Sequence, residues 1–368
     1  MSETDDHQRR LVCILCPGDL EHAGGIGRML GYLLQAWQHS DDAPPVRLID
    51  TRGPRHIAFA PLYFALALAQ ITGLAARGRI ALLHVNLASR GSALRKLIVC
   101  GLARILRIPV VIHLHGAQFD IFFRGLPAPG QRAVRWMFGT AERVIVLGEA
   151  WRSFVVSEVG VPGSRVEIIY NGVPAPRRVR SRREPSAPLQ ILFLGRLGAR
   201  KGVPELLAAL ASPEVRRLPW HATLAGDGEV EFFGHEAARL GLAGRVRFTG
   251  WVDQQKVGEL LAAADIFVLP SHQEGLPVAV LEALANEVAV VTTPVGALPE
   301  ILEDGQSALI VAPGKADQLA AALQRLIADS ALRERIAAGG HAVFRQKFDV
   351  ARIARAFSGV YDAVARAA

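Results

Sequence analysis

Two glutamates, Glu274 and Glu282, stand eight positions apart in the segment SHQEGLPVAVLEALANEVAVVTTPVGALPE, which runs from residue 271 to residue 300. Pro277 suits the first turn of a helix because it has no backbone N–H, so we predict a helix from about Pro277 to Asn286. Glu274 then lies in the loop before this helix, and Glu282 lies inside it. A carboxylate in such a loop can accept hydrogen bonds from ligand hydroxyls, while the free N–H groups of the helix start face a phosphate.

Two cations, Arg196 and Lys201, follow the apolar run ILFLG and stand among Gly195, Gly198 and Gly202. Arginine offers a planar fork and lysine a point charge, so the pair suits two phosphates of different geometry. The glycines allow a ligand to approach the backbone closely. We therefore predict a pyrophosphate site in which these cations stabilise the charge of the leaving group. The alternative is two surface cations in a loop.

Glycines also follow the first apolar run, at Gly24, Gly25 and Gly27, and Arg28 comes directly after them. Glycines at the start of a helix let N–H groups reach a phosphate, as in dinucleotide sites. The spacing G-G-x-G differs from G-x-G-x-x-G, however, and the loop is lengthened by residues 19–23, so NAD is disfavoured. A turn formed without strain is the other interpretation.

Two histidines, His113 and His115, alternate along the run PVVIHLH, which ends just before Gly116. Side chains two apart on a strand lie on the same face. We expect His115 at the carboxyl edge of the sheet, facing a ligand, and His113 further inside as a core histidine with its hydrogen bonds satisfied.

The segment EGLPVAVLEALANEVAVVTTPVGALPEIL resembles the E-x7-E signature of the family 4 retaining glycosyltransferases, which have the two-domain GT-B fold and use nucleotide-sugar donors. Six further segments agree with this family in the expected order. They are GGIGR (24–28), HLHG (113–116), YNGVP (170–174), GRLGARKG (195–202), AGDGE (225–229) and VRFTGWV (246–252).

The resemblance implies a role for each motif residue. Glu274 would hydrogen-bond the transferred sugar, Glu282 the ribose hydroxyls, and His115 would lie near the reacting carbon. A salt bridge is the alternative role of Glu282. The catalytic residues would be Glu274, His115, Arg196 and Lys201, with Gly25, Phe248, Gly275, Leu276 and Glu282 also binding the donor and Gly24, Arg28, Asp120 and Arg124 on the acceptor side.

The chain contains no D-x-D pair, the usual device for holding a divalent metal on a nucleotide-sugar in the other major glycosyltransferase fold. We therefore expect metal-independent transfer. The family resemblance implies retention of the anomeric configuration, no cofactor, and a UDP-sugar or GDP-sugar as donor. The leading hypothesis is transfer of a mannose- or glucose-type hexose to a glycan or polyprenyl-linked oligosaccharide in envelope or exopolysaccharide biosynthesis. The alternatives are a nucleotide-sugar 2-epimerase of GT-B fold, a non-catalytic nucleotide-sugar-binding subunit and, more distantly, a dehydrogenase.

Apolar runs alternate with helical patterns throughout, which indicates an α/β protein with doubly wound parallel sheets. We predict twelve strands in two series of six, split by a stretch rich in proline and arginine. The predicted domains are 1–175 and 189–348, joined by a linker over 176–188, with two Rossmann-like folds facing a cleft. By resemblance, a C-terminal helix over 349–368 crosses back to the first domain.

Composition narrows the class further. With 368 residues, 51% hydrophobic and 21% charged, the chain is globular and long enough for two domains. Three cysteines are too few for a disulfide framework, and Cys13 and Cys16 are interpreted as strand residues. No signal peptide is visible, so we expect a cytoplasmic protein. The apolar stretch 57–76 is interpreted as a core helix, because Pro61 and polar residues interrupt it as a membrane span.

The net charge of +8 is unevenly spread. Residues 90–107 form a basic amphipathic pattern without an acidic residue, which suits the anionic inner face of the cell membrane. A solvated basic face is the alternative, and nucleic acid is disfavoured because no recognition motif accompanies the charge. The cations of this predicted membrane contact are Arg90, Arg95, Lys96, Arg104 and Arg107.

Overall fold

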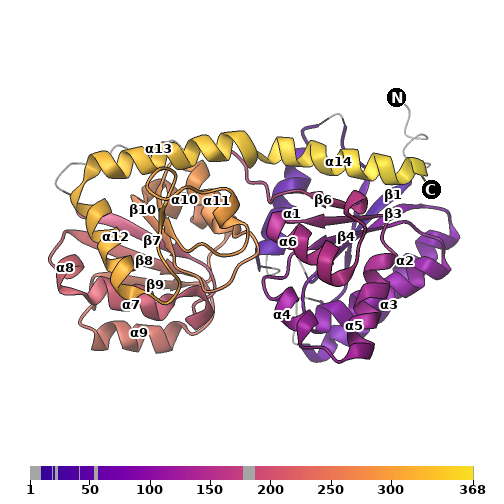
Figure 1. Ribbon diagram of the computed structural model, residues 1–368, viewed down its shortest axis with the longest axis horizontal. Coiled ribbons are helices and arrows are strands. Elements are labelled where there is room, and N and C mark those ends of the chain that lie inside the picture. Colours follow the sequence, from indigo (N-terminus) through magenta and orange to yellow (C-terminus); the bar gives the residue numbers. More distant parts are fainter. Residues whose placement is uncertain are drawn as a thin grey trace. The chain divides into compact units, whose positions relative to one another are not determined.

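The chain folds into two compact units in a computed structural model, which describes residues 10–18, 20, 24–40, 42–53, 57–176 and 187–367 (Figure 1). Unit 1 comprises Met1–Gly172 and Val350–Ala368, and unit 2 comprises Val173–Asp349. Unit 1 ends three residues before the predicted end of the first domain, whereas unit 2 begins at Val173 and so includes the predicted linker over 176–188. Most of the predicted linker, residues 177–186, lies outside the described residues.

Unit 1 is built on a six-stranded parallel sheet with the order β2-β1-β3-β4-β5-β6. Its strands are β1 (Leu11–Cys16), β2 (Val46–Asp50), β3 (Ile80–Leu87), β4 (Val110–Leu114), β5 (Arg143–Val146) and β6 (Val166–Ile168). Its helices are α1 (Gly24–Trp37), α2 (Ala60–Ala76), α3 (Gly91–Ile105), α4 (Phe119–Arg124), α5 (Ala128–Gly139), α6 (Glu149–Phe154) and α14 (Val350–Ala367), with short turns η1 (Ile57–Phe59), η2 (Val155–Val159) and η3 (Gly163–Arg165).

Unit 2 repeats this plan with the order β12-β11-β10-β7-β8-β9. Its strands are β7 (Leu189–Leu194), β8 (Trp220–Ala225), β9 (Val246–Gly250), β10 (Ile266–Leu269), β11 (Ala289–Thr292) and β12 (Leu309–Ile310). Its helices are α7 (Val203–Ala211), α8 (Pro213–Arg216), α9 (Val230–Arg239), α10 (Gln254–Ala263), α11 (Val278–Ala285), α12 (Ala316–Ala328) and α13 (Ser330–Lys347), with short turns η4 (Ala199–Lys201) and η5 (Leu298–Glu300).

The central strands are almost wholly apolar and buried, as strands covered by helices on both faces must be. The sequence analysis therefore located all twelve strands, with most boundaries within two residues. Cys13 and Cys16 are buried on β1, which confirms that they are strand residues.

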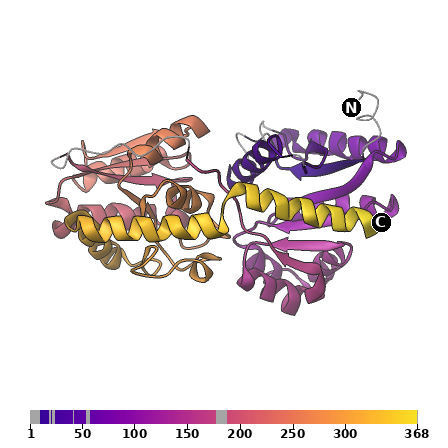
Figure 2. The same cartoon turned by 90° about the horizontal axis from the view of Figure 1, so that it is seen from above.

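The C-terminal helix α14 belongs to unit 1, as the resemblance implied, and Figure 2 shows it lying over the sheet of that unit. Its apolar side chains pack against the first domain, and Tyr361 is 2% exposed. The indole nitrogen Nε1 of Trp37, on α1, donates hydrogen bonds to the Ala354 carbonyl at 3.3 Å and to the Ser358 hydroxyl at 3.1 Å. A helix that ends the sequence thereby completes the core that the first residues begin.

Two interpretations of apolar and basic segments were wrong. The segment 57–76 is not a core helix, because only Ala60, Ala67 and Ile71 of α2 are buried. Lys96, assigned to a membrane-facing surface, is 1% exposed and donates a hydrogen bond to the Thr51 hydroxyl at 2.7 Å. Burial lowers the pKa of Lys96 to about 7. Among the described residues, no helix combines the length and the apolar character needed to cross a membrane.

Candidate active site

The motif residues of unit 2 lie in loops at the carboxyl edge of its sheet. The loops after β7, β8, β10 and β11 hold residues 195–202, 226–229, 270–277 and 293–297. Because β10, β7 and β8 are adjacent in the sheet, their carboxyl ends bring these loops together. Ligands of open parallel sheets collect at this edge.

Lys201 and Glu274 form an ion pair, with 2.5 Å between Nζ and Oε1. The Ser271 hydroxyl donates a second hydrogen bond to the same carboxylate oxygen at 2.7 Å. The side chains of Lys201 and Glu274 are 16% and 8% exposed, so the pair lies just below the surface. Among the residues that the structure describes, none donates a hydrogen bond to Oε2 of Glu274, and this oxygen can accept a hydrogen bond from a ligand hydroxyl. Sequence reasoning missed Ser271, although its position directly after the strand and one proline was a signal.

Backbone contacts between neighbouring loops fix this pair. His272 N donates to the Arg200 carbonyl at 2.9 Å, and the Arg200 guanidinium donates to the Gln273 carbonyl at 3.0 Å. Gly202 has φ of 73°, and a Cβ there would lie 2.1 Å from the Pro270 carbonyl oxygen. Only glycine allows the two loops to approach so closely.

Arg196 lies apart from this pair, on the side of β8. Its side chain is 72% exposed, and its guanidinium stands 3.5 Å from the Asp227 carboxylate. An exposed pair at this distance is weak. Arg196 can therefore exchange Asp227 for a ligand phosphate at little cost in free energy.

The other predicted donor-binding residues of unit 2 surround the same edge. Glu282 is 3% exposed within α11, which begins one residue later than expected because Pro277 is its N-cap. Gly275 accepts a hydrogen bond from Ala297 N at 2.9 Å, and Leu276 is buried. Phe248 is half-buried on the edge strand β9.

His115 of unit 1 follows β4 at the carboxyl edge of the other sheet. Its Nε2 is 2.7 Å from Oδ1 of Asn86, and Nδ2 of Asn86 donates to the Leu15 carbonyl at 3.0 Å. The amide nitrogen of Asn86 already donates to the Leu15 carbonyl, so the atom that faces His115 is the amide oxygen, which can only accept a hydrogen bond. Nε2 of His115 must therefore carry the proton. Sequence reasoning did not assign this role to Asn86. Burial, and then the charge of His84, lower the pKa of His115 to about 3, so the ring is neutral at pH 7.

His113 is buried beneath His115, with 3.7 Å between the ring centroids, but it is not the satisfied core histidine that we expected. Within the described part of the chain, neither of its ring nitrogens has a hydrogen-bond partner. The neighbouring His84 bonds the Tyr361 hydroxyl of α14 at 2.6 Å through Nδ1. Burial lowers the pKa of His84 to about 4, and burial followed by the charges of His115 and His84 lowers the pKa of His113 further below its usual value.

This histidine cluster predicts an acid-sensitive unit 1. Histidines in the unfolded chain have a pKa near 6.5. Below about pH 6.5 the buried histidines therefore bind protons in the unfolded chain but not in the folded one. The contribution of His84 and His113 to stability is complete above that pH and is lost as the pH falls toward 4. Each adds a slope approaching about 1.4 kcal/mol per pH unit.

We expect His113→Phe to flatten this acid dependence, because the variant removes a titrating ring without breaking a hydrogen bond. The measurement is hydrogen exchange of β3 and β4 amides between pH 4 and pH 7. His221→Asn, at an exposed position of β8, is the matched control and should change nothing. Equal acid dependence in His113→Phe and the wild type would contradict the interpretation.

The remaining predicted residues of unit 1 fall into two groups. Gly24 and Gly25 are exposed in the first turn of α1, and Arg28 lies one turn later; residues 19 and 21–23 of the preceding loop are outside the described residues. The Arg124 guanidinium is already engaged, because it donates to both carboxylate oxygens of Glu158, at 2.6 and 2.9 Å, and to Asp120 at 3.3 Å. Arg124 is thus held within unit 1 by two carboxylates, whereas Asp120 takes part in this network only through Oδ2.

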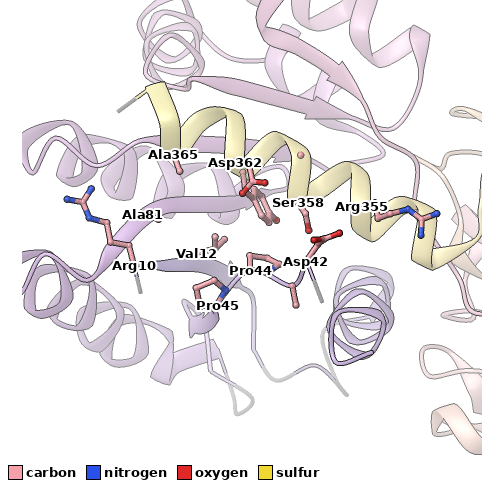
Figure 3. Close-up of a pocket in the computed structure, with 13 residues that line it drawn as sticks. Arg10, Val12, Asp42, Pro44, Pro45, Ala81, Arg355, Ser358, Asp362 and Ala365 are labelled. Atoms are coloured by element: carbon pink, nitrogen blue, oxygen red, sulfur yellow. The ribbon is translucent and has the colours of Figure 1, made fainter. Parts of the chain in front are cut away.

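A cavity of about 600 Å³ lies elsewhere in unit 1, beneath α14 (Figure 3). Its charged lining includes Arg10, Asp42, Arg355 and Asp362, near the amino ends of β1 to β3. None of the predicted site residues lines it. The candidate site therefore rests on the loops at the carboxyl edges and not on this cavity.

Two Rossmann-like units, each with its motif loops at the carboxyl edge of a parallel sheet, define the GT-B fold. The described chain has a TM-score of 0.72 and 20% identity to Anabaena Alr3699/HepE, a structure in complex with UDP and glucose; the match covers 96% of this chain and 100% of that one. At this identity the likeness shows the fold alone.

The sequence assigns the family. The profile described as "Glycosyltransferase Family 4" matches residues 23–177, and that described as "Glycosyl transferases group 1" matches residues 176–342. The chain belongs to glycosyltransferase family 4.

Curated relatives include a glycogen synthase and a lipopolysaccharide core biosynthesis glycosyltransferase. The chain is 29% identical to the glycogen synthase of Mycobacterium tuberculosis (strain CDC 1551 / Oshkosh) over 273 residues, which cover 72% of this chain and 66% of that protein. It is 35% identical over 221 residues to the lipopolysaccharide core biosynthesis glycosyltransferase LpsE of Rhizobium meliloti (strain 1021), covering 60% of each. The chain thus spans slightly less than two thirds of the length of these relatives.

Proposed function

We propose that this chain is a retaining hexosyltransferase, which moves a mannose- or glucose-type sugar from a nucleoside diphosphate to a glycan or polyprenyl-linked oligosaccharide. The observation that carries the proposal is the ion pair between Lys201 and Glu274, held by Ser271 at the carboxyl edge of unit 2. It brings a phosphate-binding cation and a sugar-binding carboxylate within one hydrogen bond of each other. A nucleotide-sugar presents these two groups, phosphate and sugar, side by side.

Each residue has one part in the proposed reaction. Lys201 and Arg196 neutralise the pyrophosphate as negative charge grows on the leaving phosphate oxygen. Oε2 of Glu274 accepts a hydrogen bond from a sugar hydroxyl and so orients the sugar ring, and the buried carboxylate of Glu282 accepts hydrogen bonds from the ribose hydroxyls. Asn86 holds the neutral His115 ring through Nε2–H, which leaves Nδ1 to accept a hydrogen bond from a sugar hydroxyl. The leaving phosphate takes the acceptor's proton on the same face, so the anomeric configuration is retained.

The donor nucleotide, the acceptor and the independence from a metal ion are proposed from the relatives and from the charge of the site. UDP is the first nucleotide to test because HepE holds it, and GDP is the second. LpsE acts in lipopolysaccharide core biosynthesis, which supports an envelope glycan as acceptor. A lipid-linked acceptor brings the reaction to a membrane, so contact with anionic lipid is part of the proposal. We propose that Lys201 and Arg196 supply the positive charge that a metal ion provides in other transferases.

The test is calorimetry of UDP, GDP, ADP and NAD, without added metal, against the wild type, Glu282→Gln and Glu282→Ala. One nucleoside diphosphate should bind, and Glu282→Gln should weaken it by about tenfold, since a buried carboxylate that accepts two hydroxyls contributes about 1–3 kcal/mol. Glu287→Gln, at an exposed position two residues after the end of α11, is the matched control. Binding of NAD alone, or of no nucleotide, would contradict the transferase proposal. Nucleotide binding without transfer to any acceptor would favour the non-catalytic subunit.

A further inference from the structure

Helix α2 leaves a row of apolar side chains uncovered. Leu62 and Leu66, one turn apart, are 59% and 51% exposed, and Phe59 in the preceding turn is 50% exposed. The helix is apolar almost all round, yet only Ala60, Ala67 and Ile71 of its side chains are buried. Single exposed apolar residues are ordinary, but a contiguous row of them marks a contact surface.

The row continues on the neighbouring helices. Leu94, Ile98 and Ile105 of α3 are 63%, 46% and 79% exposed, and they lie on the side of α3 opposite its buried residues. Trp136 of α5 is 45% exposed, and its ring lies beside Gly101 of α3.

These three helices lie on the same side of the sheet. They follow β2, β3 and β4, and each crosses to the next strand in the same direction, so right-handed crossovers put them together. Figure 1 shows α2, α3 and α5 grouped on the side opposite α14. Their exposed apolar side chains are hereafter called the α2–α3–α5 face.

The charge around this face has a single sign. Residues 51–119 contain nine lysines and arginines and no aspartate or glutamate, and no acidic residue occurs between Asp120 and Glu142. Arg104 and Arg107 at the end of α3, Arg90 at its start and Arg132 of α5 are exposed. Among the described residues, none of these four arginines has a carboxylate partner. They remain able to bind anions outside the protein.

We infer that the α2–α3–α5 face docks onto an anionic lipid surface. Leucine, isoleucine and tryptophan side chains enter the boundary between headgroups and acyl chains, while the arginines around them contact the lipid phosphates. A second copy of the chain fits poorly, because a two-fold interface would set the same arginines against one another. The inference rests on the proposed function only for its purpose, which is to bring unit 1 to a lipid-linked acceptor.

Sedimentation of the full chain with lipid vesicles tests this inference. The vesicles contain phosphatidylcholine alone or phosphatidylcholine with phosphatidylglycerol, and the salt concentration is varied. Arg104→Gln/Arg107→Gln removes two cations, and Leu62→Ser/Leu66→Ser/Ile105→Ser removes apolar contacts. Arg217→Gln/Arg325→Gln and Phe232→Ser, at exposed positions of unit 2, are the matched controls.

We expect binding to the anionic vesicles only, weakened about tenfold by the arginine variant at low salt. The apolar variant should lose the binding that persists at high salt, and both control variants should bind like the wild type. The inference would be overturned if the wild-type chain did not bind anionic vesicles, or if either face variant bound them as the wild type does. Self-association that the apolar variant abolishes would instead assign the face to a second copy. Calorimetry of UDP and GDP with the same variants separates this inference from the proposed function, because nucleotide binding does not involve the face.

Discussion

Transferase activity is expected to fall about 10²- to 10³-fold when Lys201 is replaced by methionine, because a fixed charge at the leaving group acts mainly in the transition state. Methionine keeps the apolar stem and removes the ammonium group. The loss should therefore appear in kcat more than in KM. Arg196→Met should cost less, since its guanidinium is 72% exposed and screened by water.

The same substitution is also expected to destabilise unit 2, which must be separated from the catalytic effect. Without Lys201, Glu274 is a carboxylate only 8% exposed that keeps the hydrogen bond from Ser271 but loses its cation, and an unpaired charge of this kind costs about 1–3 kcal/mol. The double variant Lys201→Met/Glu274→Gln should recover most of the stability and none of the activity. Urea unfolding and steady-state kinetics of the three proteins distinguish the effects. If Lys201→Met transferred sugar at the wild-type rate, the proposed role of the cation would be wrong.

The fold followed from the sequence because buried parallel strands have a strong signature. The run IFVL contains no polar residue, and the single threonine of AVVT is buried, so the position of such strands is nearly independent of tertiary detail. The family motifs then named the loops at the strand ends. Glu274 and Lys201 are 73 residues apart in sequence, yet the motifs assigned both to the donor, and the structure places them in contact.

The predictions that were wrong share a physical cause. A local pattern of apolar or charged residues does not show which other element of the fold covers them. The apolar composition of α2 is compatible with a buried helix and with an exposed one. What decides between them is whether another element covers the outer face of the helix, and the sequence of α2 does not show this. Lys96 fitted the periodicity of a basic face, but its partner Thr51 lies 45 residues away, after a different strand. His113 likewise depends on the register of β3 and β4, which aligns Asn86 with His113 and so determines which ring nitrogens find a partner.

Gly296 provides the sharpest test of how the loops hold the site. Its φ is +61°, and a Cβ there would lie 2.1 Å from the Gly275 carbonyl oxygen and 2.5 Å from that of Glu274. We expect Gly296→Ala to reduce the free energy of unfolding by about 2–4 kcal/mol, because the left-handed backbone disfavours a side chain and the methyl group must displace the loop. The displaced loop is the one that presents Glu274 to Lys201.

Gly305→Ala is the matched control for this substitution. Gly305 has a similar φ of +73°, but a Cβ there meets nothing within 4 Å, so only the backbone cost of about 1–2 kcal/mol applies. Urea unfolding should rank the variants in that order, and calorimetry should show weakened nucleotide binding in Gly296→Ala alone. Equal losses of stability in the two variants, with nucleotide binding intact in both, would mean that the 274–275 loop adapts freely. Close packing of that loop against Gly296 would then have no part in aligning the carboxylate with its cation.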